Sequence, residues 1–155
     1  MAVTTRATEA LSGLGVEFSV VSHRPVGSLA EAAELRGIAP ADLVKTLVVR
    51  RGEDDYLFVL LPGDRSLSWP KLRSWLGVSR LSMPDAATAL AVTGYERGTI
   101  TPFGSTRAWP VVADSSIAGR RISMGGGAHG VGVMLDADAA LTALKAETAD
   151  ISEAM

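Results

Sequence analysis

The chain of 155 residues contains no cysteine, and only three of its 15 basic residues are lysines. The absence of cysteine excludes disulfides, thiolate zinc sites, iron–sulfur sites and a cysteine nucleophile. Aromatic residues make up 5% of the chain, and its formal net charge is −2. General binding to duplex nucleic acid rests on many neutralised phosphates, so this weakly acidic balance argues against DNA binding and leaves room only for a local basic patch.

Long apolar runs are also missing. No segment approaches the roughly 18 apolar residues of a membrane-spanning helix, and the densest stretch, 56–62, has the length of a strand. The N-terminal residues lack the continuous apolar segment of a secretory signal, so we expect a cytoplasmic protein that does not bind a membrane. With 47% hydrophobic residues, the chain is long enough to form one domain over 1–155 with its own core.

Hydrophobic periodicity and capping residues predict about five helices and about seven short strands in mixed order. The helices are expected over 4–14, 28–37, 68–76, 85–94 and 136–149, and the strands over 16–20, 43–50, 56–61, 78–82, 109–113, 122–124 and 131–135. Strict alternation of strand and helix is absent. This order favours an α+β domain with a mixed, strongly curved, barrel-like sheet of about six to seven strands.

The sequence lacks several familiar cofactor, metal and nucleophile motifs, or matches them without the structural context that they require. The segment from Gly125 to Gly130 matches the GxGxxG pattern of dinucleotide-binding loops, but the strand-like residues 131–135 follow it where that fold requires a helix. P-loop and nucleophile-elbow motifs are absent, and His23 and His129 are too far apart for the HExxH zinc motif. The sequence therefore predicts neither a metal nor a cofactor.

Lys45 stands out because it lies in an apolar strand. Side chains alternate between the two faces of a strand, which places Lys45 with Leu43 and Leu47 on one face and Thr46 on the other. Because both faces are apolar, we expect this strand to be central in its sheet. A lysine there must be paired, reach water or line a polar cleft, so a structural role and a role in a site are equally open.

Two glycine-rich loops are further candidates. Gly98 and Gly104 bracket a loop whose backbone N–H groups are able to bind an anion or oxyanion, although an ordinary turn is the commoner explanation. Three consecutive glycines precede His129, and their conformational cost suggests a close ligand, a bulge or a positive φ. His129 itself is open to roles as a general base, a ligand contact or a surface residue. For Asp114 we prefer capping of the turn at Ser115 over a polar network.

These segments together resemble those of the YbaK/EbsC-type aminoacyl-tRNA deacylases, the family that includes the editing domain inserted in some prolyl-tRNA synthetases. The similarity covers about residues 15–145. The matching segments, taken together and in this order, are specific to the family, although each segment alone is weak evidence. The stretches that carry the similarity are Val44 to Leu47, Leu60 to Asp64, Thr93 to Tyr95 leading to Gly98, Pro102 to Gly104, Val112 to Asp114, and Gly125 to Gly127.

The resemblance implies hydrolysis of the ester between a small, wrongly attached amino acid and a tRNA, often tRNA(Pro), without metal or cofactor. It implies that Lys45 helps to hold the 3′-terminal adenosine and the reacting ester, and that the loop ending at Gly104 supplies contacts at the reacting centre. The substrate-binding residues it implies are Thr46, Thr101, Pro102, Phe103, Asp114, Gly125, Gly126, Gly127 and His129. The expected partner is the acceptor end of an aminoacyl-tRNA, approached in trans, with a prolyl-tRNA synthetase as a candidate second partner.

The chemistry of this substrate fits the residues present. An ester is labile enough for electrostatic positioning to suffice without a dedicated nucleophile. Two alternatives stay open: a non-catalytic module of the same fold that binds aminoacyl-tRNA or a nucleotide, and an esterase that acts on small molecules. The sequence also predicts that Gly126→Val lowers activity more than stability, because the new side chain would fill space that the substrate needs.

Overall fold

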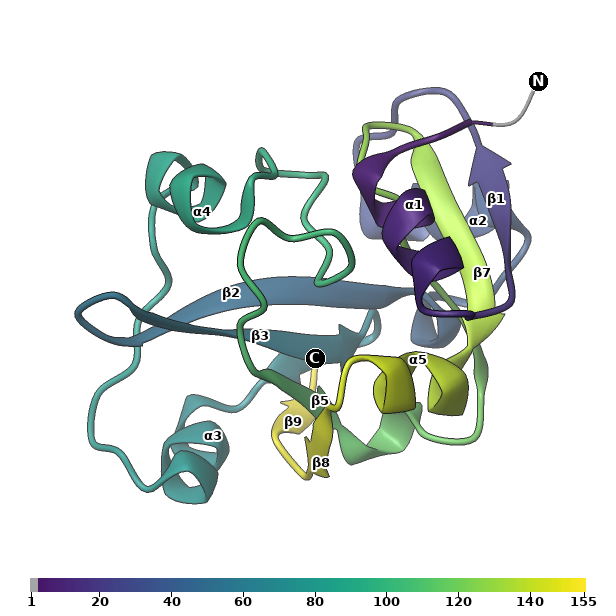
Figure 1. The fold of residues 1–155 in the computed structure, drawn as a ribbon. Coiled ribbons are helices and arrows are strands. Elements are labelled where there is room, and N and C mark those ends of the chain that lie inside the picture. Colours follow the sequence, from purple (N-terminus) through teal and green to yellow (C-terminus); the bar gives the residue numbers. More distant parts are fainter. Residues whose placement is uncertain (1–2) are drawn as a thin grey trace.

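The structure is a computed structural model that describes residues 3–155. Within this range five α-helices and nine strands follow one another in mixed order (Figure 1), which confirms the α+β class. The helices are α1 (Arg6–Gly13), α2 (Leu29–Arg36), α3 (Trp69–Leu76), α4 (Ala86–Thr93) and α5 (Ala137–Ala143). The strands are β1 (Phe18–Ser22), β2 (Val44–Gly52), β3 (Asp55–Pro62), β4 (Arg65–Leu67), β5 (Val111–Asp114), β6 (Arg121–Gly125), β7 (Val131–Asp136), β8 (Glu147–Ala149) and β9 (Ser152–Ala154). In the described part of the chain, none of the helices is long and apolar enough to cross a membrane.

The strands form three separate sheets. One is antiparallel with the order β1-β7-β6, and a small antiparallel pair joins β4 to β9. The third has the order β2-β3-β5-β8, in which β2 and β3 are antiparallel and β3, β5 and β8 are parallel. Over residues 3–155 no sheet closes on itself, so the expected barrel-like curvature is wrong. Apolar alternation along a strand reports which face is buried, but it does not report which strands pair.

The main core joins the two larger sheets with helices α1 and α5. Within β3, Phe58 and Leu60 face this core, whereas Leu57 and Val59 face a second core that Leu72 of α3 covers. Successive residues of a strand point to opposite faces, so β3 is buried on both sides. Its continuous apolar sequence is typical of such a strand.

β2 lies at an edge of its sheet, so the expectation of a central strand is wrong. Its apolar character has another cause. Val44 and Val48 contribute to the main core, and Val49 contributes to the second core on the opposite face. Both faces are therefore covered although one long edge is not paired with a neighbouring strand.

Helix starts follow the capping residues of the sequence. The five helices begin after side chains that accept a backbone N–H of the first turn, from Thr5, Ser28, Ser68, Asp85 and Asp136. Two expectations fail. The strand expected over 78–82 reduces to one bridge between Ser82 and Arg50. The last helix stops at Ala143, Lys145 adopts a φ of +53°, and β8 then pairs with β5.

Candidate functional site

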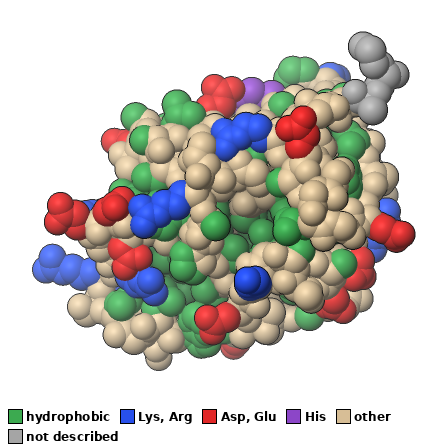
Figure 2. All heavy atoms as spheres, viewed as in Figure 1, with side chains coloured by type: hydrophobic (Ala, Val, Ile, Leu, Met, Phe, Trp, Pro, Cys, Tyr) green, Lys and Arg blue, Asp and Glu red, His purple; other side chains and the backbone are tan. Residues whose placement is uncertain are grey.

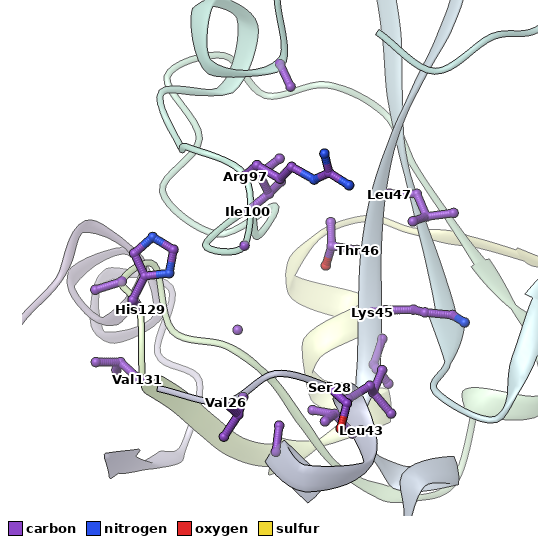
Figure 3. Close-up of a pocket in the computed structure, with 18 of the residues that line it drawn as sticks. Val26, Ser28, Leu43, Lys45, Thr46, Leu47, Arg97, Ile100, His129 and Val131 are labelled. Carbon is purple, nitrogen blue, oxygen red and sulfur yellow. The ribbon is translucent and has the colours of Figure 1, made fainter. Parts of the chain in front are cut away.

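A cavity of about 1290 Å³ opens along the unpaired edge of β2. Its other walls come from the segment before α2, the start of α4, the loop after α4, and the glycine-rich loop between β6 and β7 (Figure 3). Four of the expected site residues line it, namely Lys45, Thr46, Gly125 and His129. The fold therefore brings together parts of segments that are far apart in the sequence.

Lys45 and Thr46 project from opposite sides of β2 (Figure 3). Thr46 points toward the loop that carries Arg97 and Ile100, and its hydroxyl is buried without a hydrogen-bond partner among the described residues. Burial lowers the pKa of the Lys45 ammonium, and the carboxylate of Asp64 opposes this shift in part. A buried hydroxyl without a protein partner and a partly desolvated cation make Thr46 and Lys45 candidate binding groups of this cavity.

Only the first part of the loop between α4 and β5 reaches the cavity. Gly98 and Ile100 line it, whereas Thr101, Pro102 and Phe103 are buried in the interior and do not. The side-chain hydroxyl of Thr101 accepts a hydrogen bond of 3.3 Å from the Phe103 N–H, which holds the turn of the loop. The expected residues of this loop thus support it from the interior, and its contacts with the cavity come from Arg97, Gly98 and Ile100.

Gly104 faces helix α1 instead of the cavity. Its φ is +75°, and a Cβ there would lie 2.6 Å from both the Arg6 carbonyl oxygen and the Tyr95 hydroxyl oxygen. Its own carbonyl accepts a hydrogen bond of 2.6 Å from the Arg6 guanidinium. A glycine is required at this point because α1 packs directly on the loop backbone.

The three consecutive glycines have different surroundings. Gly125 lines the cavity, but Gly126 and Gly127 do not. A Cβ on Gly126 would lie 2.6 Å from Val131 Cγ1 and 2.9 Å from the Val131 carbonyl oxygen. A Cβ on Gly127, where φ is +86°, would lie 3.1 Å from Ala7 Cβ. Close packing against β7 and α1 therefore explains two of the three glycines.

His129 lies at the rim of the cavity and connects two of its loops. Its Nε2 is 2.8 Å from Glu96 Oε1, and both side chains are more than half exposed. A Cβ on Gly98 would lie 3.2 Å from His129 Cε1, so the imidazole ring rests against that glycine. This position suits a residue that adjusts the shape of the entrance.

Asp114 lies at the end of β5, away from the cavity wall. Its carboxylate accepts hydrogen bonds from the N–H and the hydroxyl of Ser116 and, at 3.1 Å, from the N–H of Ile151. Burial alone would raise the pKa of Asp114, but the hydrogen bonds outweigh it and the pKa is lowered. These contacts support the turn-capping interpretation and fix the segment between β8 and β9.

Two further basic residues line the cavity and were not expected, Arg36 and Arg97. The Arg36 guanidinium donates hydrogen bonds to His23 Nε2 at 3.2 Å and to the Ser123 hydroxyl at 2.9 Å, and burial lowers its pKa. Its partners are distant in the sequence, so no local pattern signals its role. Arg97 could have been identified from the sequence, because it directly precedes Gly98 at the start of the glycine-bracketed loop. In the described chain the wall carries three cationic side chains and the carboxylate of Asp85.

The described residues thus form a cavity along a sheet edge whose wall carries Lys45, Arg36 and Arg97. Residues 23–142 match the family model of the aminoacyl-tRNA editing domain. The chain belongs to this family.

Curated relatives include proteins of two kinds. A proline–tRNA ligase of Thermosipho africanus is 32% identical over 117 residues, which are 73% of this chain and 20% of the ligase. The multifunctional Ser/Thr-tRNA deacylase ProXp-y of Escherichia coli K12 is 32% identical over 107 residues, which are 67% of this chain and 64% of that protein. The chain thus spans about a fifth of the ligases that it matches.

Solved structures share the fold over nearly the whole chain. The crystal structure of a hypothetical protein superposes with a TM-score of 0.88 at 25% identity and covers 96% of this chain and 100% of its own. That of a protein proposed to be a trans-editing enzyme for prolyl tRNA synthetase superposes with a TM-score of 0.89 at 23% identity and covers 98% and 99%. At that identity the second match establishes the fold alone.

Proposed function

We propose that this chain is an aminoacyl-tRNA deacylase that removes a small, wrongly attached amino acid from a tRNA, acting in trans in the cytoplasm. The observation that carries the proposal is the cavity along β2, which is lined by Lys45, by Thr46 with its unpartnered hydroxyl and by the loop at Gly98, in a member of the editing-domain family. The ligase relatives are named for proline and the deacylase relative for serine and threonine. tRNA(Pro) is therefore the first tRNA to test.

The proposed reaction adds water to the ester carbonyl carbon, passes through a tetrahedral oxyanion and releases the terminal ribose oxygen, which takes up a proton. Because the ester is labile, the main requirement is to hold the ester and the water and to stabilise the oxyanion. We assign part of both tasks to Lys45, whose ammonium helps to hold the terminal adenosine and the ester and favours the developing negative charge. The scheme uses neither a metal nor a cofactor.

A second hollow of about 470 Å³ extends the basic surface beside the cavity, and four arginines line it, Arg50, Arg51, Arg73 and Arg80. Arg51 is bound to Asp55 through two hydrogen bonds of 3.0 and 3.2 Å. Across residues 3–155 the other three arginines form no ion pair. Figure 2 shows charged side chains of both signs at the end of the molecule where the β2–β3 hairpin turns. Because residues of β2 line both hollows, this local basic patch supports a polyanionic substrate in spite of the negative net charge.

Arg80→Ala is expected to weaken tRNA binding and to reduce the slope of log affinity against log salt concentration by about 1, because one phosphate contact and its counterion release are lost. Binding titrations at several salt concentrations measure this slope. Arg121→Ala is the matched control, since Arg121 is exposed on β6 and lines neither hollow. Equal slopes for the two variants would show that the second hollow does not contact the tRNA.

His129→Ala is expected to lower the rate of deacylation about tenfold, which is the scale of one polar contact. It is also expected to change the order of preference among aminoacyl groups. The reason is the position of His129, which connects two loops at the cavity entrance through Glu96. Single-turnover rates on several aminoacyl-tRNAs measure the effect. Glu96→Ala, which removes the same contact and leaves the imidazole, should reproduce part of it. Complete loss of turnover on every substrate would instead make His129 an essential base.

The proposed function is tested with a panel of tRNAs carrying cysteine, alanine, serine or threonine, on tRNA(Pro) and on one other tRNA. Release of at least one amino acid well above the spontaneous rate is expected. Binding of the panel without release would instead favour a non-catalytic module. Rapid turnover of simple esters that lack tRNA would favour a small-molecule esterase.

A further inference from the structure

The open edge of β2 presents unpaired backbone groups to the cavity. Arg50 exchanges both of its backbone groups with Ser82, through hydrogen bonds of 2.7 and 3.1 Å, so these groups point away from β3. Phe58, which lies opposite Val48, donates its N–H to Pro110 at 2.8 Å and so also points away from β2. In an antiparallel pair this orientation recurs at every second residue. Thr46 and Val48 therefore direct both N–H and C=O toward the cavity.

The edge is free only over a short length. Leu43 forms a bridge with Ser123 at one end, and Arg50 forms the bridge with Ser82 at the other. Between these bridges, the described residues provide no hydrogen-bond partner for the backbone of Thr46 or Val48. Val48 is only 4% exposed. Buried backbone groups in native proteins are almost always paired, with protein or with ordered water. The backbone groups of Thr46, which is half-buried, are therefore available to a ligand that enters the cavity.

The ligand that fits is the aminoacyl group itself. An amino-acid ester has the same N–Cα–C=O unit as one residue of a strand, with a donor at the ammonium and an acceptor at the carbonyl. In a hydrogen-bonded antiparallel pair, two facing residues exchange both N–H···O bonds. We propose that the aminoacyl group adds to β2 as a single residue opposite Thr46, its ammonium donating to the Thr46 carbonyl and its ester carbonyl accepting from the Thr46 N–H.

This pairing rests on the proposed function and gives the edge two tasks. The Thr46 N–H aims at the oxygen that becomes negative when water attacks, which is the position of an oxyanion donor. The Thr46 carbonyl selects a free α-ammonium. Directly opposed residues also carry their side chains on the same face, so the amino-acid side chain lies on the Thr46 face, toward the loop of Ile100 (Figure 3).

The first test uses the wild-type protein and three acyl groups on one tRNA. They are the aminoacyl group that is released fastest in the panel, its N-acetyl derivative, and the α-hydroxy acid of the same size. Each catalysed rate is divided by the spontaneous rate of the same ester, which removes the intrinsic difference in lability. We expect the hydroxy acid to lose about 10- to 100-fold in this ratio, the scale of a hydrogen bond to a charged group. The N-acetyl ester is expected to lose more, because it is also bulkier.

Equal ratios for the amino acid and the hydroxy acid would overturn the pairing and leave the proposed function intact. Failure to release any of the three, the free aminoacyl group included, would overturn the function and the pairing together. The two failures are thus distinguishable in one experiment.

The second test compares Thr46→Pro with Thr46→Ala. Proline removes the N–H, and this loss is compatible with folding because the N–H of Thr46 is not part of the β2–β3 ladder. Alanine removes the hydroxyl and keeps both backbone groups. We expect Thr46→Pro to lose at least about 100-fold in single-turnover rate relative to Thr46→Ala, the effect of deleting one oxyanion donor. Equal rates for two folded variants would overturn the pairing. If the proline variant does not fold, the substrate series decides the question alone.

Discussion

Lys45→Ala is expected to lower the single-turnover rate of deacylation by about 100- to 1000-fold, the loss typical of removing one preorganised electrostatic group. The melting temperature should change little. Burial lowers the pKa of Lys45, so the charged form is less stable in the folded chain than in the unfolded one. This penalty is present below the folded pKa and disappears as the pH rises above the unfolded value. Among residues 3–155 Lys45 forms no ion pair, so removing its charge takes no such contact away.

Two further variants sharpen the measurement. Lys45→Arg should restore activity only in part, because a planar guanidinium does not replace a compact ammonium. Lys71→Ala is the control, since Lys71 forms an exposed ion pair with Asp150 and does not line the cavity. A melting temperature many degrees lower for Lys45→Ala, or a wild-type rate with mischarged tRNA, would make Lys45 a structural residue.

Gly126→Val is expected to destabilise the fold, by about 1–3 kcal/mol for overpacking a dense interior. For a chain of this length, that corresponds to a melting temperature roughly 2–12 °C lower. The cause is the contact with Val131, since even a Cβ would lie 2.6 Å from Cγ1 and 2.9 Å from the carbonyl oxygen. Thermal unfolding followed by circular dichroism measures the shift. This expectation replaces the sequence-based one, in which activity was to fall more than stability.

The neighbouring glycine provides the matched comparison. A Cβ on Gly125 would lie 3.5 Å from the Ile100 carbonyl oxygen, an ordinary contact, and Gly125 lines the cavity. Gly125→Ala should therefore unfold near the wild-type temperature. If Gly126→Val instead unfolds like the wild type and is inactive, Gly126 approaches the substrate and not β7.

Local signals in the sequence were reliable guides to local structure. Thr5, Asp85 and Asp136, which lie at or next to the expected starts of three helices, cap those helices in the structure. The end of α5 was missed because its alanine-rich continuation favours a helix, and no glycine or proline interrupts it before β8. Pairing with β5 overrides that preference. Such pairing joins residues that are distant in the chain, so no local pattern encodes it, and the division into three sheets was missed for the same reason.

The candidate site was predictable to a similar extent. Lys45 was found because a lysine in an apolar strand needs an explanation, and Thr46 was implied by the family resemblance; both line the cavity. Glycine, in contrast, signals a backbone that needs space but not what occupies that space. At Gly104 and Gly126 the neighbours are α1 and β7. Arg36 gave no signal, because its position in the wall depends on tertiary contacts alone.

The short free edge of β2 also affects how the protein behaves at high concentration. Unpaired strand edges are templates for intermolecular sheets and hence for aggregation. Here the bridges at Leu43 and Arg50 close both ends of the edge, and the unpaired backbone groups of Thr46 and Val48 lie between them. A strand from a second molecule needs a longer row of partners than two alternate residues provide. A short open edge is one of the ways in which β-proteins limit edge-to-edge association, so the same short length that suits a single amino acid in our proposal also disfavours pairing with a second molecule.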